Sequence, residues 1–320
     1  MRLAKTSGIA ARLLSVLITL FGISVFIFIV LRVIPGDTIT GSLGIETGVL
    51  TPEQIDDLKR YYGIDKPLLL QYFSWITSFL GGDLGFAYST GVSVLTLTAS
   101  SLPVTIELAL FGTISGVIMG IAIGMFSAKK PGSARDFFGQ LFGLLALAIP
   151  GFVLSTAIVT IMANKFGYFP NGYEYMTPWE DLWMNLQQML FPSIVLGIAV
   201  AAPVMRTTRS ALLETVDKDF IRTAFGKGLK NRTVQFRHVL RNSLIPIVTM
   251  TGIQFGYLLG GAVIVEKIFA LPGMGRQILD AINKREYATV QSSVMIFAIL
   301  FVTINLVTDI IYRRIDPRSK

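Results

Sequence analysis

The sequence contains no cysteine, which excludes disulfide bonds and metal sites built on thiolates. It contains one histidine, His238, so it cannot form a metal site from several histidines. Charged residues are also scarce: they make up 15% of the 320 residues, whereas a soluble globular domain carries about 25%. Hydrophobic residues make up 52%. This balance indicates that lipid, rather than water, surrounds much of the chain.

Sequence motifs that would make the chain an enzyme are missing as well. The phosphate-binding pattern G-x-x-x-x-G-K-[ST] does not occur, and the Phe-Gly-Lys-Gly stretch at 225–228 has neither its spacing nor a preceding strand. No Ser-His-Asp set and no metal-binding cluster can be recognised around the one histidine. We therefore expect no catalytic residue, metal or cofactor in this chain, and we expect any ATP hydrolysis to occur in another chain.

Six long runs of the sequence are free of charged residues, and each is close to the roughly 20 apolar residues that a bilayer span needs. Helices suit these runs because lipid offers no hydrogen-bond partner to open backbone groups. We expect an all-α membrane protein with one transmembrane domain over residues 1–320. Its six predicted spans are about 13–31, 108–128, 137–161, 184–205, 242–265 and 288–308.

The first apolar run has a basic flank, which also fits a signal peptide. However, the run is longer than the roughly 7–15 apolar residues of a signal core. The segment Arg32–Asp37 (RVIPGD) follows it, where a signal peptide would carry a small-residue cleavage site. We expect an uncleaved first helix.

Positive charge gathers in the segments that would share one side of the membrane with the N-terminus. Nineteen of the 28 basic residues, but only six of the 20 acidic ones, fall in 1–12, 129–136, 206–241 and 309–320. Lysine and arginine in short loops mark the cytosolic side. We therefore expect both termini in the cytosol. The net charge of +8 then needs no nucleic acid as partner.

The connection 32–100 is long and is expected outside the cell, after the first span. A helix is predicted from Thr51, a candidate cap, with Pro52 at its first position. A second, amphipathic helix is predicted in 66–82, where the aromatic side chains suit a membrane interface. These segments could form a docking surface or could simply pack on the helix bundle.

The loop 206–241 holds nine of the 28 basic residues, and apolar residues recur between them at helical spacing. Asp217 or Asp219 could cap a short helix, Gly228 could end it, and a second helix could start near 231–233. Two apolar rows run along the first helix: Phe220, Ala224 and Gly228 form one, and Ile221, Phe225 and Leu229 form the other. Such a loop could orient the protein, lie on the lipid surface or dock into a groove of a partner protein.

Glycines recur every four residues in two predicted spans, which lets helices approach closely in lipid. These packing seams are predicted at Gly112, Gly116, Gly120, Gly124, Gly252, Gly256 and Gly260. The seams could be static, or they could slide during transport. Near the start of the second span, Glu107 is a carboxylate that could face a substrate or simply mark the interface.

Two stretches of the loop resemble a known family. Phe220–Gly228 (FIRTAFGKG) and Arg237–Pro246 (RHVLRNSLIP) resemble the cytosolic loop of permease subunits in binding-protein-dependent ABC importers, in the peptide and nickel branch. The main departure is Gly226, where the branch has alanine, because glycine within a helix costs about 1 kcal/mol. Further stretches that resemble this branch are Leu31–Asp37, Tyr62–Thr90, Ser101–Leu110, Val263–Gly275 and Ile311–Arg318.

The resemblance implies a transmembrane subunit of an ATP-driven importer in the cytoplasmic (inner) membrane of a bacterium or archaeon. It implies a second permease chain, two ATPase subunits that hold ATP and Mg²⁺, and an external substrate-binding protein. The implied substrates are di- or oligopeptides, with nickel complexes or oligosaccharides as alternatives, and no residue here chooses among them. The residues implied at the ATPase-coupling interface are Phe220, Ile221, Arg222, Thr223, Ala224, Phe225, Lys227 and Gly228.

A self-sufficient secondary transporter or channel is the alternative function. Such proteins usually place ionisable groups along the pathway. The interiors of the predicted spans contain almost none, which favours the ABC importer.

Overall fold

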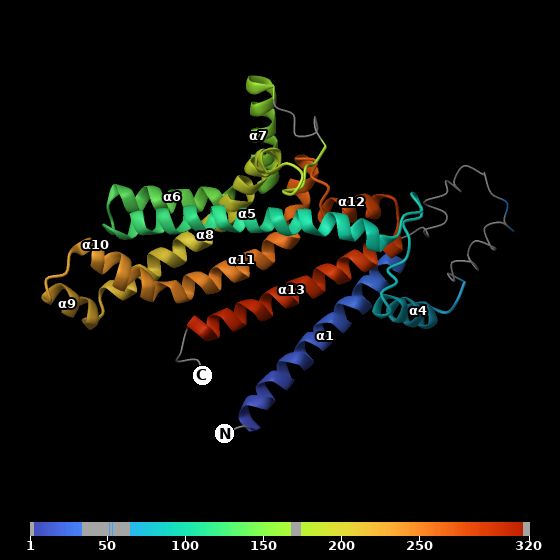
Figure 1. Ribbon diagram of the computed structural model, residues 1–320, viewed down its shortest axis with the longest axis horizontal. Coiled ribbons are helices and arrows are strands. Elements are labelled where there is room, and N and C mark those ends of the chain that lie inside the picture. The colour runs from blue at the N-terminus through green and yellow to red at the C-terminus, as the bar shows by residue number, and fades with distance from the viewer. Residues whose placement is uncertain (1–2, 34–50, 52, 54–64, 168–173, 316–320) are drawn as a thin grey trace. The chain divides into compact units, whose positions relative to one another are not determined.

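The computed structural model describes residues 3–33, 51, 53, 65–167 and 174–315, and these are largely helical (Figure 1). The helices are α1 (Leu3–Val33), α4 (Leu68–Leu80), α5 (Val94–Ala128), α6 (Ala134–Ala148), α7 (Gly151–Phe166), α8 (Leu182–Val216), α9 (Asp219–Gly226), α10 (Asn231–Thr233), the π-helix η3 (Val234–Leu240), α11 (Arg241–Ile268), α12 (Met274–Asn283) and α13 (Tyr287–Ile315). The chain divides into two compact units: Met1–Pro103 with Arg276–Val302, and Val104–Gly275 with Thr303–Lys320.

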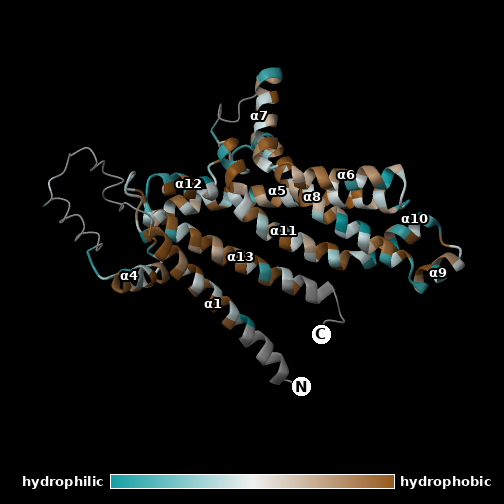
Figure 2. Ribbon diagram, turned by 180° about the vertical axis from the view of Figure 1, so that it is seen from behind, coloured by the Kyte–Doolittle hydropathy of each residue, from teal (hydrophilic) through white to brown (hydrophobic). Residues whose placement is uncertain are grey.

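Among the residues that the structure describes, five helical stretches are long and apolar enough to cross a membrane: Leu14–Val33, Val94–Ala128, Leu182–Val216, Asn231–Ile268 and Tyr287–Thr308. The pair α6 and α7 meets the same criterion together and forms a sixth candidate. Figure 2 shows hydrophobic residues along most of these helices and hydrophilic ones around α9 and α10. The all-α membrane fold that the sequence predicts is confirmed.

The third predicted span, 137–161, is not one straight helix. α6 ends at Ala148 and α7 starts at Gly151, with a bend of 95° between them. Pro150 explains the break, because a proline disfavours the helical conformation of the residue before it. Ile149 is accordingly extended, with φ −86° and ψ 116°. The absence of charge alone, on which the predicted span was based, does not reveal this break.

Several helices extend beyond their predicted spans. α5 begins at Val94, 14 residues before the predicted start, because the search for charge-free runs stopped at Glu107. α8 continues to Val216 and so takes up the first part of the loop 206–241. A helix can leave the apolar layer and continue into water, and a search based on charge alone cannot detect this continuation.

In the first unit, α4 packs against α1 through an aromatic cluster. The rings of Phe28 and Tyr72 meet edge to face at 5.3 Å, and the hydroxyls of Ser24 and Tyr72 are hydrogen-bonded at 2.8 Å. The amphipathic helix predicted in 66–82 is thereby confirmed. The helix predicted from Thr51 lies almost entirely outside the described residues.

Two further contacts tie the first unit together. The amide of Ser89 donates to the carboxylate of Glu286 at 3.0 Å. The hydroxyl of Ser292, near the start of α13, donates to the carbonyl of Leu84 at 2.9 Å. Each bond joins segments about 200 residues apart in the chain. The residues between α4 and α5 therefore depend on α13 for their position.

In the second unit, α8 packs against α6, α7 and α11. Asp181 caps its start, because its carboxylate accepts from the amide of Met184 at 3.0 Å. Pro192 and Pro203 lie inside α8 without ending it. In a membrane, neighbouring helices can satisfy the backbone groups that such prolines free. α8 therefore forms the centre of this unit.

The glycines of α5 lie directly against α8. A methyl group at Gly112, Gly116, Gly120 or Gly124 would meet Leu196, Val200, Val204 or Thr208 at 2.6 to 2.9 Å, closer than side chains normally approach. On α11, a methyl group at Gly252 would collide with Thr308, and Gly256 is buried. Gly260 differs, because no described atom of another residue would lie within 4 Å of such a methyl group. The α5 glycines therefore set the close approach of α5 to α8, and Gly260 has no such role within this chain.

Candidate functional site

The short helix α9 is fastened to the rest of the second unit by one apolar cluster. The cluster consists of Leu212, Ile221, Ala224, Val234 and Val239. Ile221 is only 1% exposed and Ala224 only 6%. Both had been predicted at a partner interface, and the structure instead buries them against this chain's own α8 and η3. They point inward because residues three apart on a helix share one face.

Because Ile221 and Ala224 point inward, the opposite face of α9 points outward. Arg222, Thr223 and Gly226 lie on the side of the helix away from the buried pair, and all three are exposed. Phe220 and Phe225 lie on the two flanks and are 42% and 47% exposed. The two rings therefore border a small, polar strip on which a partner could rest.

Gly226 lies on this strip, and its missing side chain leaves open space. A methyl group there would meet no described atom of another residue within 4 Å. Alanine would therefore fit within this chain and would favour the helix by about 1 kcal/mol. The glycine does nothing for the packing of α9, so it is free to let a partner approach the backbone closely.

The start of α9 differs from the prediction. Its N-cap residue is Lys218, and neither Asp217 nor Asp219 makes a capping hydrogen bond in the described structure. Asp219 lies in the first turn, where a negative charge is favourable near the helix N-terminus. It forms a wide, exposed ion pair of 3.7 Å with Arg222, and such a pair contributes little to stability.

The prediction that Gly228 stops the first helix of the loop is confirmed. α9 ends at Gly226, and Gly228 belongs to its C-cap. This residue has φ +76°, a left-handed conformation that glycine adopts without strain. Its amide donates to the carbonyl of Phe225 at 2.9 Å, and the amide of Leu229 donates to that of Ala224 at 3.4 Å. These two bonds form a Schellman C-cap. The predicted second helix also starts where expected, at Asn231.

The segment after α9 runs into the membrane helix α11 without a break in helical structure. Asn231–Thr233 leads into the seven-residue π-helix η3, which leads into α11. At this junction the hydroxyl of Ser243 is fully buried and donates to the carbonyls of Ala211 or Val239, at 3.0 and 2.9 Å. It also lies 3.0 Å from the hydroxyl of Thr215. A displacement of α9 would therefore pass directly to both α8 and α11.

An ion pair that the sequence did not predict joins α8 to α6. Arg209 of α8 donates from two nitrogens to the two carboxylate oxygens of Asp136 at 2.7 Å each. Ser127 and the amide of Gly132 also donate to this carboxylate, at 2.6 and 2.9 Å. Asp136 is 2% exposed, and its partners satisfy its charge. Its position as the one acid among the basic residues of 129–136 was the available signal.

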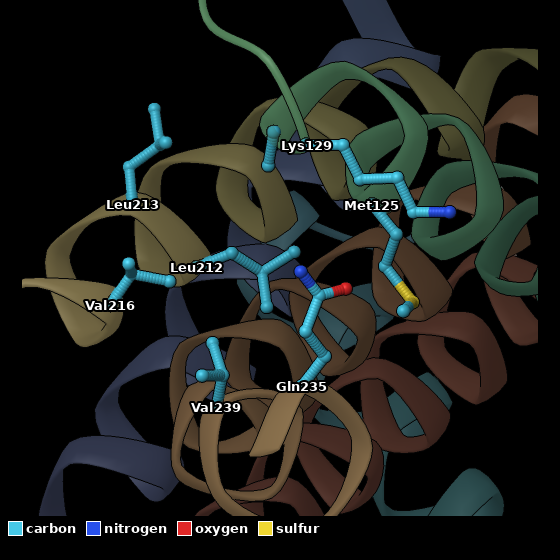
Figure 3. Close-up of a pocket in the computed structure, with 8 residues that line it drawn as sticks. Met125, Lys129, Leu212, Leu213, Val216, Gln235 and Val239 are labelled. Carbon is cyan, nitrogen blue, oxygen red and sulfur yellow. The ribbon is translucent and has the colours of Figure 1, made fainter. Parts of the chain in front are cut away.

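A small cavity lies beside the α9 anchor (Figure 3). Side chains from three places line it: Met125 and Lys129 at the end of α5, Leu212 and Val216 of α8, and Gln235 and Val239 of η3. Its volume of about 30 Å³ has room for one or two water molecules. The cavity is therefore too small for a substrate or a nucleotide.

The described ranges hold no group of three or more histidine, aspartate or glutamate residues that could bind a metal ion. The features that stand out are mechanical: α9 is an anchored helix with a free outer face, and after the short turn 227–230 a continuous helical path leads from Asn231 into α11. Such an arrangement can transmit a displacement.

Comparison with known proteins gives a consistent result over the whole length of the chain. Residues 7–109 match the N-terminal model, and residues 120–320 the main model, of the binding-protein-dependent transport system inner membrane component. The chain is 34% identical to the dipeptide transport system permease protein DppB of Alkalihalophilus pseudofirmus, covering 97% of this chain and 98% of the relative. It is 35% identical to the glutathione transport system permease protein GsiC of Pectobacterium atrosepticum, covering 96% of each.

Solved structures share the fold. The chain superposes on a chain of the methionine ABC transporter MetNI with a TM-score of 0.54 and 16% identity, covering 69% of this chain and 96% of that one. An amino acid ABC transporter matches with a TM-score of 0.52 and 18% identity, covering 68% and 94%. Since the family models together match nearly all of its residues, the chain belongs to the binding-protein-dependent transport system inner membrane components, which are the permease subunits of ABC importers.

Proposed function

We propose that this permease forms, with a second permease chain, the pathway of an ATP-driven importer for short peptides. The observation that carries the proposal is α9. Its buried side chains hold it to α8 and η3. The opposite strip stays free, and the half-exposed rings of Phe220 and Phe225 lie along its two edges. Exposed apolar rings on a short helix suit a protein groove. We assign this groove to an ATPase subunit, and each permease chain would contact one such subunit.

The orientation and the substrate rest on separate arguments. Lysine and arginine are concentrated in 1–12, 129–136, 206–241 and 309–320, which supports a cytosolic location for α9 and both termini in a bacterial or archaeal cell. The curated relatives are named for a dipeptide and for glutathione, which is itself a tripeptide. Short peptides, delivered by an external binding protein, are therefore the proposed substrates.

We infer a cycle that uses this geometry. ATP binding closes the two ATPase subunits and moves α9, and the contacts of α9 with η3, which is continuous with α11, carry this movement into α11. The pathway opens outward and receives the peptide, and hydrolysis returns it to its inward-facing state. ATP can drive this change only because the two states bind nucleotide with different affinity.

Reconstitution tests the proposal. We expect liposomes that contain the complete importer and its binding protein to accumulate a labelled dipeptide or tripeptide only when ATP reaches the ATPase subunits. An imposed proton or sodium gradient should not replace ATP. Uptake by this chain alone, driven by an ion gradient, would instead identify a secondary transporter.

A further inference from the structure

A polar network at the start of α8 lies far from α9 and has no place in the coupling mechanism. The hydroxyl of Tyr175 donates to Glu107 Oε2 at 2.7 Å. The side-chain amide of Asn185 donates to the Tyr175 hydroxyl at 3.3 Å and to the carbonyl of Met176 at 3.0 Å. Asn185 lies in the first turn of the 35-residue α8, which is about 50 Å long at 1.5 Å per residue. α9 follows the last turn, so the network and α9 lie at opposite ends of α8.

Two oxygen atoms of this network are buried and lack a donor. Glu107 Oε1 and Asn185 Oδ1 have no hydrogen-bond partner among the residues that the structure describes. Asn185 is 0% exposed, and its amide cannot be turned around, because the Met176 carbonyl can only accept. Buried acceptors without a donor are unfavourable. Both atoms therefore call for a ligand that donates hydrogen bonds.

The sequence around the network favours a cation as this donor. The described structure shows Tyr175 as the side-chain partner of Glu107 and no ion pair to a basic side chain. No lysine or arginine occurs between Lys165 and Arg206, while Glu174, Glu180 and Asp181 are all in this stretch. Carboxylates in a stretch of chain without basic residues favour a cationic ligand.

The Tyr175 hydroxyl does not serve as the missing donor. Burial, together with the hydrogen bond to Glu107, raises the pKa of Tyr175 above its usual range. The hydroxyl therefore keeps its single proton, which it already donates to Glu107 Oε2. It holds one carboxylate oxygen in place and leaves Oε1 available.

A primary ammonium group fits these two acceptors better than a divalent metal ion does. Calcium and magnesium require at least about six oxygen ligands, whereas this network offers one carboxylate and one amide oxygen. An ammonium group carries three donors and a single positive charge. We propose that Glu107 and Asn185 bind the primary ammonium group of a peptide as it passes through the permease. This assignment rests on the proposed function for its substrate class.

The segment that covers the network would have to move to admit a ligand. Residues 174–181, which carry Tyr175 and Met176, form turns and irregular structure rather than helix. This segment is held to α8 by a few side-chain contacts, among them those of Gln188 with the backbone of Met176 and Glu174, at 3.0 and 2.8 Å. Opening it breaks no helix.

Protection of a single cysteine tests this site directly, because the natural chain contains none. The variant Met176→Cys, in the assembled importer without its binding protein, is labelled with a maleimide in the presence of trialanine or N-acetyl-trialanine. We expect trialanine, at up to about 10 mM, to slow labelling, and the acetylated peptide to have no effect. Adding Glu107→Gln should weaken the protection roughly tenfold, because a charge-assisted hydrogen bond is lost. Glu214→Gln, an exposed carboxylate at the opposite end of α8, is the matched control and should leave protection unchanged.

The outcomes separate this proposal from the proposed function. Equal protection by both peptides, no protection by either, or full protection in the Glu107→Gln variant would overturn the ammonium site, and a water molecule would then be the simplest occupant. If protection follows the ammonium group but liposomes accumulate no peptide with ATP, the site stands and the importer function fails. If peptide uptake is normal but protection is absent, the function stands and the site fails.

Discussion

Replacing both Phe220 and Phe225 with glutamate is expected to reduce ATP-driven uptake at least about 30-fold, which corresponds to about 2 kcal/mol. The two rings border the free strip of α9 and are 42% and 47% exposed, so a large part of each ring stays available to a partner's groove. Charged carboxylates would have to be desolvated in that groove. The measurement is peptide uptake in liposomes, together with the amount of ATPase subunit that copurifies.

The conservative double variant, Phe220→Leu with Phe225→Leu, is the control. It keeps an apolar surface of similar size and should retain uptake within about threefold. The anchor residues Ile221 and Ala224 are unchanged in both variants, so α9 should stay folded on α8 and η3. Normal uptake by the glutamate variant would show that the flanks of α9 do not contact the ATPase.

Replacing Gly116 with leucine is expected to prevent folding or assembly of the permease. The first added carbon would lie 2.6 Å from the Cβ of Val200 and 2.7 Å from the carbonyl oxygen of Gly197. The carbonyl belongs to the backbone of α8 and cannot move aside as a side chain can. We expect a loss of stability of about 3 kcal/mol or more, since α5 and α8 would have to separate. Thermal unfolding of the purified importer measures this loss.

Gly260→Leu is the matched control, because no described atom lies within 4 Å of the added carbon apart from its chain neighbours and the nearby backbone of α11. Leucine also favours a helix over glycine, so this variant should be as stable as the natural protein or slightly more so. Equal stability of the two variants would contradict close packing at Gly116. A Gly116→Leu protein that assembles normally but transports poorly would instead favour a seam that slides during transport.

The fold was largely predictable because lipid imposes a simple rule on composition. Each span needs a long run without charge, and the apolar runs of this chain correspond to the helices observed. The end of α9 was predictable as well, since only a glycine readily adopts the φ of +76° found at Gly228. These features depend on local chemistry, which a sequence records directly.

Features that depend on contacts between residues far apart in the chain were harder to predict from the sequence. The pairing of Asp136 with Arg209 joins residues 73 apart, and neither position shows a partner in the sequence. The pattern of apolar residues in α9 was clear, but it could not tell an inward face from an outward one. The family resemblance implied an interface role for Ile221 and Ala224, whereas both pack in this chain's own core.

The bend at Pro150 shows a different limit. Pro103, Pro192, Pro203 and Pro246 lie inside helices, whereas Pro150 separates two. The difference at Pro150 is the extended conformation of Ile149 together with a following glycine. A glycine lowers helix propensity and adds freedom just where the proline has already weakened the helix. The combination Pro-Gly within an apolar run was the signal that the search for spans did not use.

Site-specific photocrosslinking tests whether the outer side of α9 contacts an ATPase subunit, as we propose. A benzophenone amino acid replaces Phe225 in one variant and Phe152 in another, a similarly exposed residue of α7 at 50% exposure. We expect a crosslink to the ATPase chain from position 225 and none from position 152. A fully assembled, active importer that gives no ATPase crosslink from position 225 would show that this side of α9 does not contact the ATPase.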